Sequence, residues 1–140
     1  MAGIHFFSED VEFTPKTPRK LKSWIITSAG KEKASINEVN YIFCSDKYLL
    51  RLNKEYLNHN TYTDIITFDN SQSKGEIEGD IFISVDRVKE NAEKFNVTFD
   101  MELHRVMIHG VLHLIGYKDK SLADKSKMRK KEDACLSLWK

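Results

Sequence analysis

The longest apolar stretch of the sequence runs from Val106 to Gly116, and its only polar side chains are those of His109 and His113. A membrane-spanning helix needs about 20 consecutive apolar residues, so this stretch is too short to cross a bilayer. Its apolar residues recur at helical spacing, and Gly116 provides a stop signal. We therefore expect a helix that carries two histidines and packs in the core of a soluble protein.

The composition indicates one globular domain over residues 1–140, because 41% of the residues are apolar and 31% are charged. A formal charge of +1 gives no global attraction to nucleic acid or anionic membranes, so any basic site must be local.

The first ten residues lack a basic leader, which predicts no secretory signal and a cytoplasmic protein. Cys44 and Cys135 are too few for a disulfide framework or a cysteine-rich zinc site, and we expect both to be reduced and buried.

The pattern of apolar residues predicts an α+β fold, with a small mixed sheet of about four strands packed with about five helices. Alternation predicts strands at residues 4–7, 36–44, 64–68 and 80–85. The short connection before the last strand makes the last two strands antiparallel neighbours. Five helices are predicted: 15–29 before Gly30, one that begins at Ser45 and Asp46, 86–95, Thr98 to Gly116, and Ser121 to near Trp139. The helix after Ser45 has an apolar face of Tyr48, Leu49, Leu52 and Tyr56.

His109 and His113 are four residues apart, which places them one turn apart on the same helix face. Two imidazoles at this spacing can bind one metal ion. Gly116 allows the chain to turn back, so that Asp119 can return as a third ligand. Two histidines and a carboxylate leave a coordination position open, as in catalytic zinc sites. We therefore expect His109, His113 and Asp119 to hold a metal ion.

Simpler interpretations of these residues remain open. The two histidines can be hydrogen-bonded side chains on a partly buried helix. Asp119 can be a solvated turn residue between Lys118 and Lys120, or a cap of the last helix. Asp124 is the competing carboxylate for the third ligand position.

Gly110 stands where metalloproteases with a His-Glu-x-x-His motif have the glutamate that acts as general base. Without that carboxylate, the nucleophile must be water activated by the ion, or a group of the substrate such as a ribose 2′-hydroxyl. The site therefore favours a phosphodiester bond in RNA over a peptide bond.

Three segments carry a resemblance to a known family. Residues 109–117 read His-Gly-Val-Leu-His-Leu-Ile-Gly-Tyr, residues 63–68 Thr-Asp-Ile-Ile-Thr-Phe, and residues 79–83 Gly-Asp-Ile-Phe-Ile. In these segments the sequence resembles the YbeY family, which are single-domain, metal-dependent endoribonucleases of bacterial ribosomal RNA maturation and ribosome quality control.

The resemblance implies a single-strand-specific endoribonuclease that processes rRNA precursors, including the 3′ end of 16S rRNA, with the small ribosomal subunit and a GTPase as partners. It implies that His109, His113 and Asp119 form the catalytic centre and hold one zinc ion, with nickel or manganese as alternatives.

The sequence departs from the family pattern at two positions. The family's third ligand is usually a histidine, and its place is taken here by Asp119, whose negative charge favours a harder ion and a less acidic water. The family also has an arginine after the tyrosine that ends the second long helix, whereas Leu57 follows Tyr56 here. Lys54 or His59 would then have to contact the phosphate.

Other residues are candidates for RNA binding or catalysis. Tyr62 and Tyr117 can stack on bases, although packing inside the fold is the commoner role. Glu102 can orient a ligand or act as a general acid or base, but an exposed helix acid is the simpler interpretation. Asp80 can hold a histidine tautomer or cap a turn. The one basic concentration is either a phosphate-binding surface or a solvated helix face; it consists of Lys118, Lys120, Lys125, Lys127, Arg129, Lys130 and Lys131.

Two further functions fit the same residues. One is a metallohydrolase that acts on another bond, because the site is better defined than the substrate. The other is a non-catalytic ribosome-associated factor in which the metal is structural.

Overall fold

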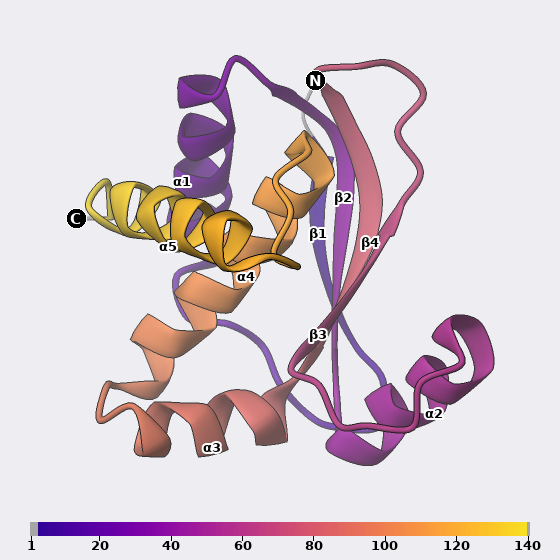
Figure 1. The fold of residues 1–140 in the computed structure, drawn as a ribbon. Coiled ribbons are helices and arrows are strands. Elements are labelled where there is room, and N and C mark those ends of the chain that lie inside the picture. The colour runs from indigo at the N-terminus through magenta and orange to yellow at the C-terminus, as the bar shows by residue number, and fades with distance from the viewer. Residues whose placement is uncertain (1–2, 140) are drawn as a thin grey trace.

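The computed structural model describes residues 3–139, which form an α+β fold with a four-stranded sheet (Figure 1). The strands are β1 (Gly3–Ser8), β2 (Ser35–Cys44), β3 (Ile65–Asp69) and β4 (Glu76–Ser84). The helices are α1 (Pro18–Lys31), α2 (Asp46–Leu57), α3 (Val85–Lys94), α4 (Phe99–Ile115) and α5 (Leu122–Leu136). The predicted fold class is confirmed.

The sheet has the order β1-β2-β4-β3 and is mixed. β1 pairs with β2 and β2 with β4 in parallel, whereas β3 and β4 are antiparallel, as the short connection between them predicts. Helices α1, α4 and α5 lie on one side of the sheet and α2 on the other (Figure 1). The sheet thus supports α4, the helix that carries the two histidines.

α4 packs unusually close to the sheet at Gly110. A Cβ at this position would lie 2.9 Å from Cδ1 of Ile81 in β4 and 3.1 Å from Cδ1 of Ile65 in β3. The first distance is shorter than real Cβ contacts and the second is tighter than most of them, so the glycine allows the helix backbone to lie close against the strands. Gly110 therefore faces the sheet, which gives a packing reason for the absence of a glutamate there.

A smaller cluster covers the other side of the sheet, where Cys44, Leu49 and Ile66 are buried. The predicted apolar face of α2 is wrong at Tyr56, which is 64% exposed. Asn53 is buried instead, because its side-chain amide donates to the carbonyl of Thr61.

Both cysteines of the chain are free and buried, as the sequence predicts. Cys44 lies at the end of β2, and Cys135 lies on the inner side of α5.

Three predicted helix ends are wrong. α1 begins at Pro18 rather than residue 15, because Thr17 is left-handed (φ 49°), and it continues through Gly30 to Lys31. α5 ends at Leu136 rather than near Trp139. Beyond Leu136, the side chain of Trp139 packs against His104, at 4.3 Å between ring centroids. That contact turns the chain back onto the core.

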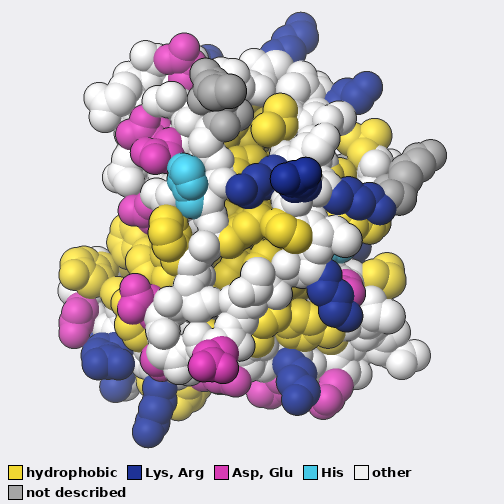
Figure 2. Space-filling view, turned by 180° about the vertical axis from the view of Figure 1, so that it is seen from behind, with side chains coloured by type: hydrophobic (Ala, Val, Ile, Leu, Met, Phe, Trp, Pro, Cys, Tyr) yellow, Lys and Arg dark blue, Asp and Glu magenta, His cyan; other side chains and the backbone are white. Residues whose placement is uncertain are grey.

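The surface carries both signs of charge without a single dominant field. On the face seen in Figure 2, basic and acidic side chains are both spread over the surface, with apolar side chains between them. No helix among residues 3–139 is long and apolar enough to cross a membrane.

Candidate metal centre

The two histidines project from the same face of α4, with 4.8 Å between their ring centroids. Thr98 caps the start of the helix by accepting from the amide of Met101. At its end Gly116 has φ 127°, a conformation that favours glycine, and its amide donates to the carbonyls of Leu112 and His113. This turn reverses the chain toward the histidines.

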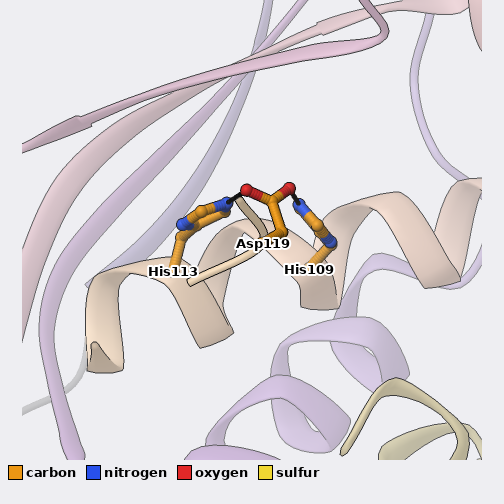
Figure 3. Close-up of side chains that lie close together, drawn as sticks. All are labelled: His109, His113 and Asp119. Carbon is orange, nitrogen blue, oxygen red and sulfur yellow. Dashed lines mark ion pairs between the residues drawn. The ribbon is translucent and has the colours of Figure 1, made fainter. Parts of the chain in front are cut away.

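Asp119 lies in the returning loop, and each of its carboxylate oxygens faces one histidine (Figure 3). Oδ2 is 3.4 Å from Nε2 of His109, and Oδ1 is 3.5 Å from Nε2 of His113. Ligand atoms of the three residues all lie within 4.8 Å of one another. Two imidazole nitrogens and a carboxylate oxygen at this spacing fit a divalent ion, so the cluster could hold a metal.

The cluster borders a cleft of about 390 Å³ between α4, α5, α3 and the start of β3. Polar side chains of both charges line much of it, so it suits a charged ligand better than an apolar one. Besides the three cluster residues, the lining consists of Thr63, Asp64, Ile65, Thr67, Asn91, Phe95, Glu102, Arg105, Val106, Arg129 and Glu132.

Two acids are held in this cleft with raised pKa values. Glu102 is 6% exposed, and burial together with the negative charge of Asp64 raises the pKa of its carboxyl group. Burial also raises the pKa of Asp64, although the positive charge of His109 opposes it. The simpler prediction for Glu102, an exposed acid, is wrong because its position on α4 faces the cleft and not the solvent.

Glu132 on α5 is a functional candidate that the sequence analysis missed. Its Oε2 lies 2.6 Å from Nδ1 of His109, and its Oε1 accepts from Arg105 at 2.9 Å. Burial lowers the pKa of His109, but the hydrogen bond to Glu132 and the charges of Glu132 and Asp119 outweigh it, so the net shift is upward. The spacing of Glu132 from Met128 and Cys135, which are both buried, gives it an inward position on α5, but no local pattern indicates that it contacts His109.

Two residues of the basic concentration, Lys131 and Arg129, have different surroundings. Lys131 pairs with Glu32 at 3.0 Å and lies over the ring of Tyr117, so it stabilises the fold. Arg129 is exposed and lines the cleft. The hydroxyl of Tyr117 donates to Glu32, which agrees with the packing role predicted for this tyrosine.

Several other candidates lie outside the cleft lining. Lys54 and His59 are exposed at the end of α2 and in the loop after it. Asp124 belongs to the capping box of α5 with Ser121, so it caps a helix and does not join the cluster. Asp80 accepts from Asn40 at 3.0 Å in the sheet, which is neither of its two predicted roles.

Tyr62 differs from its predicted packing role, because it is 55% exposed. Its loop lies outside the sheet, where the guanidinium of Arg87 sits 5.3 Å from the ring centroid.

Comparison with known proteins gives one family. Residues 4–140 match the family model described as endoribonuclease YbeY. A protein named endoribonuclease YbeY from Cytophaga hutchinsonii is 58% identical over 137 residues, which is 98% of this chain and 96% of that protein. One of the same name from Flavobacterium psychrophilum is 51% identical, covering 95% of this chain and 94% of that protein.

The fold agrees with a solution structure of a Thermotoga maritima protein, with a TM-score of 0.64 at 28% identity. The match covers 97% of this chain and 91% of that one. Family model, sequence identity and fold all extend over nearly the whole chain, which therefore belongs to the YbeY family.

Proposed function

We propose that this chain is a metal-dependent endoribonuclease that cleaves single-stranded RNA, with ribosomal RNA precursors in the cytoplasm as its substrates. The observation that carries this proposal is the convergence of His109, His113 and Asp119 at the edge of a polar cleft. Membership of a family whose curated relatives are named endoribonuclease supports the choice of RNA. The small ribosomal subunit is the proposed assembly in which the precursor is met.

We infer one zinc ion per chain, held by His109, His113 and Asp119, with nickel or manganese as alternatives. The donor set supports zinc, because imidazole and carboxylate ligands are those of catalytic zinc sites. When bound, such an ion supplies Lewis acidity to phosphate oxygens and lowers the pKa of water.

The cleft side chains have separate roles in this proposal. Arg129 has no ion pair within the described part of the chain, so its guanidinium is available to a phosphate of the RNA backbone. Arg105 is already engaged by Glu132 and Asp133. Glu102 is buried in the cleft wall, and its raised pKa moves it toward the range in which a carboxyl group exchanges protons at neutral pH.

The proposal is tested by cleavage of a single-stranded RNA that contains the 3′ end of a 16S rRNA precursor. We expect the zinc-loaded wild type to cleave it and His113→Ala to lose at least about 100-fold in rate, the size expected when electrostatic stabilisation at the reacting group is lost. His59→Ala is the matched control, because this histidine is exposed and lies outside the cleft.

Equal rates for His113→Ala and the wild type, or cleavage that survives chelation, would overturn the proposed centre. Zinc binding without cleavage of any RNA would favour a structural metal in a non-catalytic factor.

A further inference from the structure

The imidazole of His109 is contacted at both nitrogens, and this is the feature from which the inference starts. Nε2 faces Asp119 at 3.4 Å, and Nδ1 lies 2.6 Å from Oε2 of Glu132. A neutral imidazole carries one N–H, so the nitrogen that donates to a carboxylate leaves the other as the ligand atom. For His113, no hydrogen bond to Nδ1 is found within residues 3–139.

Glu132 is itself rigidly held. Its side chain is 7% exposed, and its second oxygen accepts from Nη1 of Arg105 at 2.9 Å. Nη2 of Arg105 donates to Asp133 at 2.7 Å. Each oxygen of Glu132 therefore has its own partner, and rotation of the carboxylate would break one bond to keep the other.

We propose that Glu132 is the positioning residue of the metal centre: it accepts from Nδ1 of His109, and thereby keeps Nε2 unprotonated and directed toward Asp119. The pairing of a ligand histidine with a carboxylate is a general way to fix its tautomer and ring orientation. The inference rests on the proposed function in one respect: it takes a metal ion to be what His109, His113 and Asp119 bind. It makes α5 part of the centre, although α5 supplies no ligand.

A purely structural role is the competing explanation, in which Glu132 serves only to pair with Arg105 and fix α5 to α4. Asp133 allows the two roles to be separated. It is the next residue on α5 and contacts the same arginine. Its side chain is 58% exposed, and Arg105 is its one ion-pair partner among the described residues. Asp133→Asn is therefore the matched control for a loss of arginine pairing.

The first measurement is the tautomer of His109 by nitrogen NMR in the metal-free protein at pH 8. We expect Nδ1 to carry the proton in the wild type, in Asp133→Asn, and in Glu132→Gln, whose amide oxygen still accepts. In Glu132→Ala we expect a mixture of tautomers. A wild type with the proton on Nε2, or an unchanged tautomer in Glu132→Ala, would overturn the proposal.

The second measurement is zinc affinity by competition with a chelator. Glu132→Ala should weaken binding roughly 10- to 100-fold, the range found when such partners of ligand histidines are removed. Glu132→Gln should recover part of this loss, and Asp133→Asn should stay within about twofold of the wild type on the same principle. Equal affinities for Glu132→Ala and Asp133→Asn would contradict the positioning role.

The tests remain informative if one variant or the proposed function fails. If Glu132→Ala does not fold, the tautomer of His109 in the wild type still tests the proposal, because a proton on Nε2 would overturn it. If the wild type binds no zinc, the proposed function fails, while the tautomer of His109 in the metal-free protein still tests the role of Glu132.

Discussion

Asp119 is the residue at which this centre is most distinctive, because it places a carboxylate between two imidazoles. Each oxygen faces one Nε2, so the loop after α4 delivers the group without any further rearrangement of the chain. A carboxylate is a harder ligand than an imidazole and is accepted by manganese as well as zinc. The identity of residue 119 should therefore control which ion is preferred.

The first prediction concerns this preference. Asp119→His should retain one ion per chain and raise the affinity for zinc relative to manganese, because imidazole suits zinc and carboxylate suits manganese. Competition of the two ions for the purified protein measures the ratio. A ratio that stays the same or moves toward manganese would show that residue 119 is not a ligand.

The second prediction concerns the buried carboxyl of Glu102, whose pKa is raised by burial and by the charge of Asp64. The folded state then holds this proton more tightly than the unfolded state. The contribution to stability is therefore present at low pH and is lost as the pH rises through the folded-state pKa. Glu102→Gln removes the ionisation, so its free energy of unfolding relative to the wild type should increase from pH 4 to pH 8.

Denaturant unfolding of the chelated proteins at several pH values measures this difference. Glu93→Gln is the control, because Glu93 is exposed on α3 and its substitution should give no such trend. A Glu102→Gln difference that is flat with pH, or that falls, would contradict the burial argument.

At the level of the elements, the position of α4 on the sheet determines where the histidines point. The helix backbone approaches β3 and β4 at Gly110, one residue after His109, and this contact fixes the rotation of the helix about its axis. One face is then pressed against the strands while His109 and His113 face the cleft.

The third prediction tests this close approach. Gly110→Ala should be less stable than Gly30→Ala by about 1 to 3 kcal/mol, the usual cost of overpacking a core. Both glycines lie in helices, so both substitutions gain helix propensity. A Cβ at Gly30 meets no atom within 4 Å, whereas one at Gly110 meets Ile81. Denaturant unfolding measures both, and equal stabilities would mean that the helix does not need the glycine.

The elements also show which features were predictable from sequence. The existence and order of the strands and the ends of α4 follow from local patterns, and the three cluster residues lie within one helix and its return loop. The predicted start of the last strand at residue 80 is wrong, because β4 begins at Glu76, where its pairing with β2 extends it into the expected connection. Glu132 could not be predicted in this way, because it reaches His109 across 23 residues through the packing of α5 on α4. The burial of Glu102 likewise depends on which helices surround the cleft. Local spacing thus predicts the cluster of His109, His113 and Asp119, whereas the side chains that contact it depend on tertiary packing.

At the level of the whole molecule, a formal charge of +1 means that RNA cannot be attracted by a general positive field. Basic residues near the cleft must supply the attraction, and part of them are used internally, as Lys131 is by Glu32. Arg129 lines the cleft and is exposed. Binding should therefore depend on few charges.

The fourth prediction follows from this distribution. Arg129→Gln should weaken binding of single-stranded RNA and reduce the slope of log affinity against log salt by about 0.7, the value for one phosphate contact on a single strand. Lys47→Gln, on the exposed side of α2, should leave the slope unchanged. The opposite result, with Lys47 controlling the slope, would place the RNA on the other side of the sheet.

The most direct test of the central claim is the metal content of the purified protein, measured by mass spectrometry after metal-replete preparation. We predict one ion per chain in the wild type and in His59→Ala, and loss of the ion in both His113→Ala and Asp119→Ala. A wild type without metal, or variants that keep the full amount, would contradict a centre formed by His109, His113 and Asp119.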